Sequence, residues 1–323
     1  PHPRARRGFN CPTPSTLAQR VRTADADPDR PTWRAKVRNL PPLDESALRP
    51  AQITAINGIE QSLADQHFDR SLVQMATGAG KTFTAVTTAY RLLKFGGFRR
   101  ILFLVDRNNL AEQTLAEFQN YRTPGDGRRF TEIYNADKLT SAGMLGSSDV
   151  VVSTIQRVFS VLRGQDVTEG DDPNLDDYVP DAPVTVTYSS ALPPEAFDLV
   201  IVDEAHRSIY GVWRGVLEYF DAHIIGLTAT PGKQTFAFFR QNLVSEYTYP
   251  QSVADRVNVD FDLYRIRTRI SEQGANIEAG TIVPKVDRRT RQQRLESIEE
   301  DFEYTHKQLD RAVTAKSQIR LVL

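Results

Sequence analysis

Residues 199–210 read LVIVDEAHRSIY. A run of apolar, β-forming residues passes directly into two carboxylates, Asp203 and Glu204, and a histidine, His206, follows. One interpretation is a strand that ends in a charged turn. The other is a buried strand whose end places carboxylates in a phosphoryl-transfer site. The rest of the sequence has to distinguish between them.

Other short apolar runs share this character: SLVQM (71–75), ILFLV (101–105), DVVV (149–152) and HIIGL (223–227). Helical patterns lie between several of them, at 81–95, 108–121 and 210–220, and another helix starts near Arg49–Pro50. Continuous Val/Ile/Leu runs that alternate with helices are typical of a parallel sheet buried on both faces. We therefore predict a doubly wound α/β fold with its site at the carboxyl ends of the strands.

The segment ATGAGKT (76–82) comes between the first of these strands and a helix. Glycines are needed where backbone N–H groups close around phosphate oxygens, and the helix N-terminus favours an anion. Lys81 would reach the β- and γ-phosphates, and the Thr82 hydroxyl would bind Mg²⁺. Met75 occupies the position of the first glycine of the full pattern, so only the GxGKT half is present. The alternative is an ordinary glycine turn that caps a helix.

The carboxylates of LVIVDEAH would supply the parts of a phosphoryl-transfer site that the glycine loop lacks. In a phosphoryl-transfer site one Asp at a strand end holds Mg²⁺ and a neighbouring Glu orients the attacking water. Asp203 and Glu204 fit these two roles. The two motifs on separate strand ends of one sheet favour a Mg-ATP site over two unrelated turns.

Composition excludes several other classes. The chain has 323 residues, a net charge of −1 and one cysteine, so it has no internal disulfide and no cysteine-based metal cage. Its apolar runs are too short to cross a membrane, which needs about 20 residues. The five histidines show no ligand spacing for a metal. These features predict a cytoplasmic protein without a membrane segment.

The pattern also predicts how the chain is divided. Residues 1–45 are interpreted as a linker with one short helix, 46–255 as the nucleotide-binding domain, and 256–323 as a connector. An acidic insertion spans 164–194 and contains an alternating piece, VTVTYS (184–189). FDLYRIRTRI (261–270) is predicted as a strand and SIEEDFEYTHKQLDRAV (297–313) as a charged helix, giving an α+β extension.

The motifs ATGAGKT, VDRNNLAEQ, STIQ, VDEAH and GLTATP, in this order, resemble those of superfamily 2 DEAD/DEAH-box helicases and translocases. The longer stretches LRPAQ, ILFLVDRNNLAEQT, VDEAHRSIYGVWRGVLEYFDA and GLTATPGKQTFAFF resemble the motor part of the R (restriction) subunit of type I restriction enzymes. This resemblance covers about residues 46–280. It implies a RecA-like fold, ATP and Mg²⁺ as cofactors, double-stranded DNA as substrate, and methylation and specificity subunits as partners.

The resemblance also implies roles for individual residues. Gln52 matches the glutamine that recognises adenine, and Lys81, Asp203, Glu204 and His206 match the catalytic set. The implied ATP-binding loop consists of Thr77, Gly78, Ala79, Gly80, Lys81 and Thr82, with Thr82 and Asp203 on Mg²⁺. The residues implied to couple hydrolysis to movement, together with His206, are Thr228, Ala229 and Thr230. The implied contacts to the nucleic-acid backbone are Arg107, Asn108, Ser153, Thr154 and Gln156. For Arg107 and Gln156 the alternative is a solvated helix start.

Two parts of such an enzyme are not recognised in the sequence. A motor of this type needs a second RecA-like domain that supplies arginines to the ATP site, and no QxxGRxxR-like element is found. None of the lysines follows an Asp or Glu by two residues, as a (D/E)xK nuclease site requires. We therefore expect a piece of a longer protein that binds ATP and hydrolyses it poorly alone. Two alternatives remain: another superfamily 2 motor from repair or phage defence, and a non-catalytic nucleotide- or DNA-binding module.

Overall fold

A computed structural model describes residues 13–65, 68–165, 183–208, 213–262, 275–286, 292–298 and 301–304. Two sequence predictions lie mostly outside these residues: the acidic insertion 164–194, of which residues 166–182 are not described, and the strand 261–270. The chain divides into two compact units, Pro1–Val259 and Asp260–Leu323, and each is described by itself.

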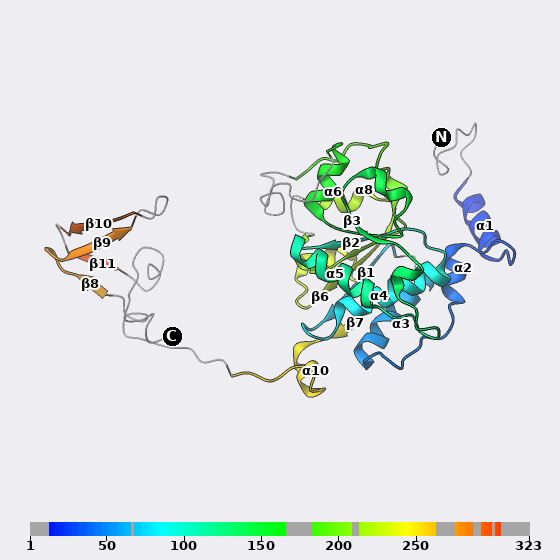
Figure 1. The fold of residues 1–323 in the computed structure, drawn as a ribbon, viewed down its shortest axis with the longest axis horizontal. Coiled ribbons are helices and arrows are strands. Elements are labelled where there is room, and N and C mark those ends of the chain that lie inside the picture. The colour runs from blue at the N-terminus through cyan, green and yellow to red at the C-terminus, as the bar shows by residue number, and fades with distance from the viewer. Residues whose placement is uncertain are drawn as a thin grey trace. The chain divides into compact units, whose positions relative to one another are not determined.

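A seven-stranded, entirely parallel sheet forms the first unit (Figure 1), with the strand order β3-β4-β2-β5-β6-β1-β7. Its strands are β1 (Arg70–Met75), β2 (Ile101–Val105), β3 (Ala136–Lys138), β4 (Val150–Thr154), β5 (Leu199–Val202), β6 (His223–Thr228) and β7 (Leu243–Tyr247). The five apolar runs predicted as strands are therefore all strands of one sheet. β5, which carries the DEAH segment, pairs with β2 on one side and β6 on the other.

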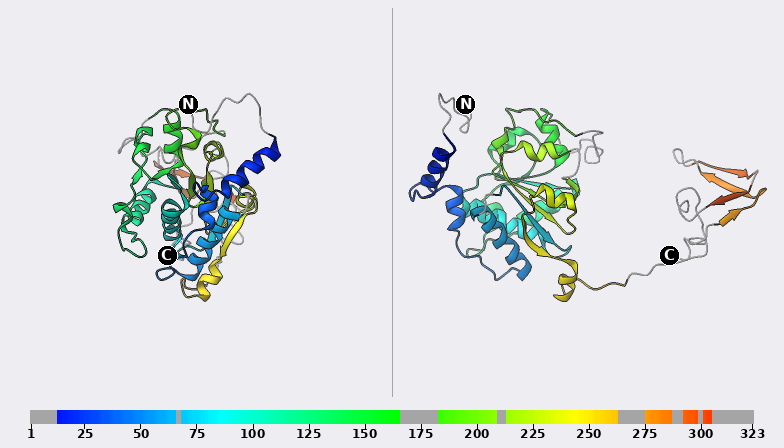
Figure 2. Two further views of the ribbon diagram at one scale, coloured as in Figure 1. Left: turned by 90° about the vertical axis from the view of Figure 1, so that its right-hand side faces the viewer. Right: turned by 180° about the vertical axis from the view of Figure 1, so that it is seen from behind.

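Helices cover both faces of this sheet (Figure 2). The described helices of the first unit are α1 (Pro14–Asp25), α2 (Trp33–Arg38), α3 (Pro50–Asp65), α4 (Lys81–Arg91), α5 (Asn108–Asn120), α6 (Ile155–Leu162), α7 (Ala205–Ser208), α8 (Arg214–Tyr219), α9 (Lys233–Phe238) and α10 (Tyr249–Ala254). A π-helical turn, Leu92–Gly96, extends α4, and 3₁₀ turns occupy Phe130–Glu132, Ala142–Gly146 and Pro194–Ala196.

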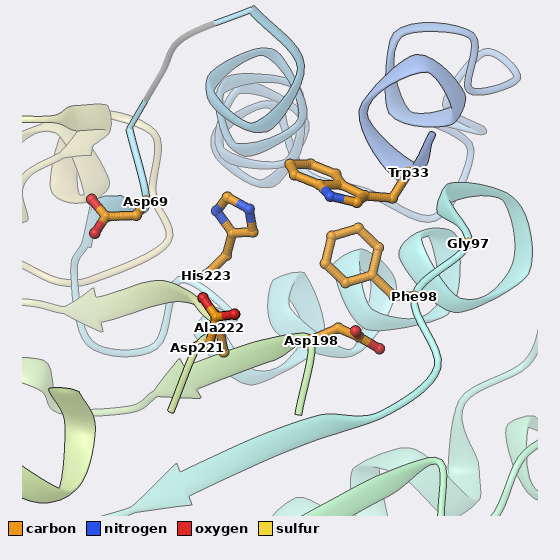
Figure 3. A pocket seen from close by; sticks show the side chains of 8 residues that line it. All are labelled: Trp33, Asp69, Gly97, Phe98, Asp198, Asp221, Ala222 and His223. Carbon is orange, nitrogen blue, oxygen red and sulfur yellow. The ribbon is translucent and has the colours of Figure 1, made fainter. Parts of the chain in front are cut away.

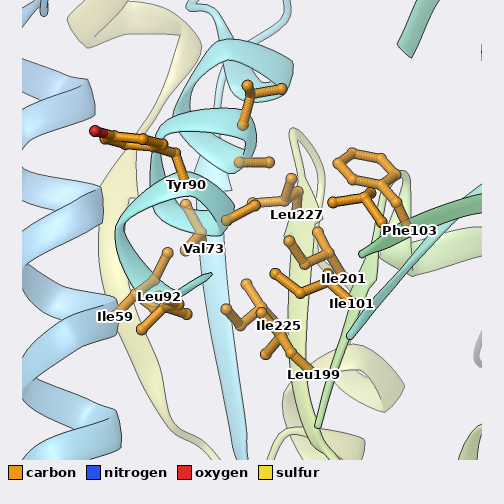
Figure 4. Close-up of a cluster of buried hydrophobic side chains, with 14 of the residues drawn as sticks. Ile59, Val73, Tyr90, Leu92, Ile101, Phe103, Leu199, Ile201, Ile225 and Leu227 are labelled. Atoms are coloured by element: carbon orange, nitrogen blue, oxygen red, sulfur yellow. The ribbon is translucent and has the colours of Figure 1, made fainter. Parts of the chain in front are cut away.

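The alternation of side chains along each strand divides the core into two clusters. In β2, Phe103 packs in the cluster under α3, α4 and α5, whereas Leu102 and Leu104 pack in the cluster under α6, α8 and α9. In β5, Ile201 and Val200 divide in the same way. Figure 4 shows the first cluster. Because successive strand residues point to opposite faces, a strand apolar at every position must be buried on both. The predicted doubly wound, RecA-like α/β fold is thus confirmed.

Some predicted boundaries differ from those observed. The helix predicted near Arg49–Pro50 is α3, and the helix predicted at 81–95 is α4 followed by the π-helical turn. The pattern at 210–220 corresponds to α8, with residues 209–212 outside the described part. The segment at 13–45 contains two helices rather than one. Residues 183–188 contain no strand, and the side chains of Val184 and Val186 pack against the second cluster.

The described residues of the second unit form two antiparallel strand pairs. β9 (Ile282–Val286) pairs with β10 (Gln293–Ser297), and β8 (Ala275–Ile277) pairs with β11 (Phe302–Tyr304). The prediction of a helix over 297–313 is therefore wrong at 302–304. Phe302 and Tyr304 are aromatic residues separated by one position, which favours a strand. Residues 305–313 lie outside the described part of the chain.

Candidate nucleotide-binding site

The loop between β1 and α4 has the geometry of a phosphate cradle. Gly78 and Gly80 adopt positive φ angles of 79° and 89°, which only glycine adopts without strain. The helix α4 begins at Lys81 directly after Gly80, so its free N–H groups face the loop. A Cβ atom at Gly80 would lie 2.4 Å from the Gln52 side-chain nitrogen. The backbone angle therefore favours glycine at this position, and a larger residue would also displace the Gln52 side chain.

Gln52 lies in the first turn of α3 and is 4% exposed. Its Oε1 atom accepts a hydrogen bond from the Arg49 backbone N–H at 2.9 Å, and its Nε2 atom donates to the Gly80 carbonyl at 3.2 Å. The Arg49 side chain donates to the Gly78 carbonyl at 3.2 Å. The residue matched to adenine recognition therefore borders the phosphate loop, although the two are far apart in sequence.

Asp203 and Glu204 follow β5 at the same edge of the sheet. The Asp203 backbone N–H donates to the Leu104 carbonyl of β2, and Asp203 Oδ1 accepts the Glu204 N–H at 2.9 Å. The Lys81 ammonium lies 3.6 Å from Glu204 Oε1, in a pair whose side chains are 10% and 29% exposed. The fold thus brings the two sequence motifs together. Glu204 has a φ angle of 46°, a left-handed conformation that is strained for a residue with a Cβ.

The electrostatics of Asp203 suit a cation ligand. Burial raises the pKa of its carboxyl, the neighbouring Glu204 charge adds to this, and Lys81 partly opposes it. A buried carboxylate of this kind is stabilised by a divalent ion. Among the described residues no group of three or more His, Cys, Asp or Glu side chains could hold a metal alone. Mg²⁺ with a nucleotide does not need one, because one or two protein ligands and the phosphates complete its coordination.

The residues matched to coupling lie beside this carboxylate pair. His206 Nδ1 is 3.0 Å from Thr228 Oγ1 and 3.4 Å from Glu204 Oε2. Thr228 ends β6 and is fully buried, and its hydroxyl accepts the Thr230 N–H at 3.2 Å. Ala229 lies between these two threonines, partly exposed. A series of close polar contacts therefore runs from Glu204 through His206 and Thr228 to the loop after β6.

The five residues matched to nucleic-acid contact lie after β2, at the end of β4 and in the first turn of α6, and β2 and β4 are neighbours in the sheet. They are not equally accessible. The Arg107 side chain is 68% exposed and lies 3.8 Å from Asp106, and Asn108 begins α5. In contrast, Ser153, Thr154 and Gln156 are buried, and Thr154 caps the N-terminus of α6. Their contact with nucleic acid stays a prediction.

Two contacts to the loop were not anticipated. The sequence predicts only a helix start at Arg49, although its place in LRPAQ, three residues before Gln52, links it to the same motif. Asn258 donates through Nδ2 to the Thr77 carbonyl at 2.9 Å. No short motif could have identified Asn258, because the contact joins segments 181 residues apart.

A cavity of about 500 Å³ lies at the opposite edge of the sheet, where the strands begin (Figure 3). Its lining includes Asp69 before β1, Asp198 before β5 and Asp221 before β6, together with Trp33 and His223. These carboxylates would repel the phosphates of a nucleotide. The glycine loop at the carboxyl edge, rather than this cavity, is therefore the candidate nucleotide site.

The sheet and its flanking helices define a helicase-like domain of the RecA class. Residues 45–233 match the family described as "Type III restriction enzyme, res subunit", and the chain belongs to this family. It is 31% identical over 266 residues to the type I restriction enzyme EcoKI endonuclease subunit of Escherichia coli (strain K12), covering 76% of this chain and 20% of that protein. It is 29% identical over 233 residues to the EcoAI endonuclease subunit of Escherichia coli, covering 66% and 24%.

The chain therefore spans about a fifth to a quarter of the length of these curated relatives. Among solved structures, it is similar to a nuclease-deletion mutant of the type ISP restriction-modification enzyme LlaGI in complex with a DNA substrate mimic. That match has 18% identity and a TM-score of 0.41, and it covers 70% of this chain and 21% of the other. The predicted resemblance to restriction-enzyme R subunits is confirmed. In the described residues, no helix is long and apolar enough to span a membrane.

Proposed function

We propose that this chain is the first motor domain of an ATP-dependent double-stranded DNA translocase, the R subunit of a type I restriction enzyme. The observation that carries this proposal is the convergence of Lys81, Glu204 and His206 beside a glycine loop at the carboxyl edge of the sheet. The curated relatives are endonuclease subunits of such enzymes. A cytoplasmic role in phage defence, with methylation and specificity subunits as partners, follows from the same proposal.

The geometry supports a sequence of events in hydrolysis. The Lys81 ammonium lies 3.6 Å from Glu204 Oε1 and forms an ion pair with it. The phosphates of ATP, bound by the glycine loop, would compete with the Glu204 carboxylate for Lys81, since a polyphosphate carries more negative charge. Glu204 would then be free to orient a water and accept its proton, while His206 holds the other carboxylate oxygen. The loss of one ion pair thereby links ATP binding to activation of the water.

Mg²⁺, held by Thr82, Asp203 and the phosphates, would supply charge neutralisation at the transferred phosphoryl group. Gln52 would recognise adenine. To do so, its side-chain amide must either break its hydrogen bond to the Gly80 carbonyl or donate to adenine with its second N–H. Arginines from a second RecA-like domain would complete the site, so slow hydrolysis is expected for the chain alone. The water-orienting Glu204 disfavours a purely non-catalytic binding module, which has no use for it.

Two substitutions test the proposal by separating binding from hydrolysis. In calorimetric titrations with MgATP, Lys81→Ala should weaken affinity about 10- to 100-fold, since bonds to charged groups contribute about 1.5–3 kcal/mol. Lys94→Ala, which removes an exposed lysine just after α4, should bind like the wild type. Glu204→Gln should still bind MgATP, but in the full-length protein its DNA-stimulated turnover should fall about 10²- to 10⁴-fold. Near-normal turnover by Glu204→Gln would show that this mechanism is wrong.

A further inference from the structure

The phosphate loop is held from outside through its carbonyl groups. Arg49 binds the Gly78 carbonyl at 3.2 Å and Gln52 binds the Gly80 carbonyl at 3.2 Å, both from the segment that starts α3. A third donor comes from the other end of the nucleotide domain: Asn258 Nδ2 binds the Thr77 carbonyl at 2.9 Å. These bonds matter because a peptide whose carbonyl points outward directs the neighbouring N–H groups inward, toward an anion.

Asn258 is itself fixed in place. It follows the end of α10, where Arg256 adopts a φ angle of 59° and turns the chain. The backbone N–H groups of Val257 and Asn258 both donate to the Ser252 carbonyl, at 2.8 and 3.1 Å. The Asn258 Nδ2 atom also donates to Ser252 Oγ at 2.9 Å, and Ser252 is fully buried. One N–H of the amide therefore anchors it to α10, and the other is aimed at the loop.

We infer that Asn258 is a positioning residue of the nucleotide site, which holds the Thr77 peptide in its phosphate-binding orientation and ties the loop to the segment leaving the domain. This inference rests on the proposed function. Asn258 lies two residues before Asp260, where the second compact unit of the chain begins. Because binding linkage is reciprocal, a nucleotide that orders the loop must also steady residues 257–259 through this amide.

A competing explanation is that Asn258 merely caps α10. The two roles differ in what they predict. A cap contributes to the stability of the fold and leaves nucleotide affinity unchanged, whereas a positioning residue changes affinity more than stability. Asn39 offers a matched comparison, since its side-chain amide donates to the Ala35 carbonyl at 2.8 Å at the end of α2, with no contact to the loop.

The experiment uses the whole chain with MgADP as the probe, titrated by calorimetry, and melting temperatures measured in parallel. Asn258→Leu removes both N–H donors with little change in size, and it should weaken MgADP binding about tenfold. Asn258→Asp should weaken it further, because it also adds a negative charge near the phosphates. Asn39→Leu should leave MgADP affinity within twofold of the wild type while lowering the melting temperature.

Hydrogen exchange supplies a readout that a simple cap would not change. In the wild type, MgADP should slow exchange of peptides that cover residues 250–260, and in Asn258→Leu this protection should disappear. MgADP affinity of Asn258→Leu within twofold of the wild type, or protection that survives the substitution, would overturn the inference while leaving the proposed function intact. No MgADP binding by the wild type would overturn the proposed function, and the inference with it.

Discussion

The imidazole of His206 and the hydroxyl of Thr228 lie 3.0 Å apart and join two neighbouring strands at the edge where the site is built. His206 follows β5, and Thr228 ends β6. On one side His206 approaches Glu204, and on the other the Thr228 hydroxyl accepts the Thr230 N–H. Two polar side chains thus connect the carboxylate that would orient water with the loop after β6.

Thr228→Val should reduce DNA-stimulated hydrolysis while leaving nucleotide affinity nearly unchanged. Valine has nearly the same shape but no hydroxyl, so His206 and the Thr230 N–H both lose a partner. We expect MgATP affinity to change little, because Thr228 does not contact the phosphate loop in the described structure. DNA-stimulated hydrolysis in the full-length protein should fall about 2- to 30-fold, the range for loss of a coupling contact. Steady-state ATPase assays with and without double-stranded DNA measure this effect.

Thr235→Val is the control for this substitution. Thr235 is also fully buried and its hydroxyl also accepts a backbone N–H, from Gly232 at 2.9 Å, but no bond joins it to His206. Thr235→Val should lower the unfolding free energy by about 1–3 kcal/mol, because the Gly232 N–H loses its partner. It should not selectively reduce the stimulation of hydrolysis by DNA. Equal loss of stimulation in both variants would contradict a specific role for the His206–Thr228 contact.

Glu204 should show a conflict between stability and activity. Its φ angle of 46° lowers the unfolding free energy by about 1–2 kcal/mol for a residue with a Cβ. Glycine avoids this strain but loses more backbone entropy on folding, so it recovers only part of that free energy. We therefore expect Glu204→Gly to be about 0.5–1 kcal/mol more stable than Glu204→Ala in urea unfolding, although both lose hydrolysis. At Glu117, within α5, the order should reverse, because glycine destabilises a helix interior. The same order at both positions would argue against strain at Glu204.

Gly80→Ala should damage the site by two separable effects. The φ angle of +89° strains any side chain, and the added Cβ would lie 2.4 Å from Gln52 Nε2. Gly125 has a φ angle of +90° with nothing within 4 Å of an added Cβ, so Gly125→Ala isolates the backbone effect. Both variants should lose about 1–2 kcal/mol of unfolding free energy from strain. Only Gly80→Ala should also lose MgADP binding, at least tenfold by calorimetry. Equal binding by the two variants would mean that Gln52 yields without cost.

The sequence predicts the centre of this fold better than its edges, for a physical reason. β2 and β5 are buried and apolar at every position, and β1, β4 and β6 each contain a shorter buried apolar run, because these strands lie inside the sheet. The strands that were not predicted, β3 and β7, lie at the two edges of the sheet. Every position of β3 (ADK) is only partly buried, and β7 (LVSEY) is buried only at Ser245 and Tyr247, so both strands carry polar residues. Apolar runs alone cannot identify such strands.

The sequence likewise predicts some features of the candidate site and not others. The meeting of Lys81 and Glu204 could be predicted because both residues follow strands of one parallel sheet, whose carboxyl ends lie at the same edge. The left-handed backbone of Glu204 and the contact of Asn258 with Thr77 could not, since each arises only when distant segments pack together. The helix prediction is wrong at residues 302–304 because a charged stretch is compatible with an exposed strand as well as with an exposed helix.

Acid should destabilise the native state partly through His223, which lies beside the cavity of Figure 3. Burial lowers the pKa of this imidazole, and the nearby Arg34 charge lowers it further, against opposing contributions from Asp69, Asp221 and Asp198. The native state therefore takes up a proton less readily than the unfolded chain, whose histidine titrates near about 6.5. Stability must fall as the pH drops below that value toward the lower native pKa. His223→Gln, neutral throughout, should show a smaller loss than the wild type between pH 7.5 and 5.5 in urea unfolding. Identical losses would show that the imidazole is protonated as easily in the native state as in the unfolded chain.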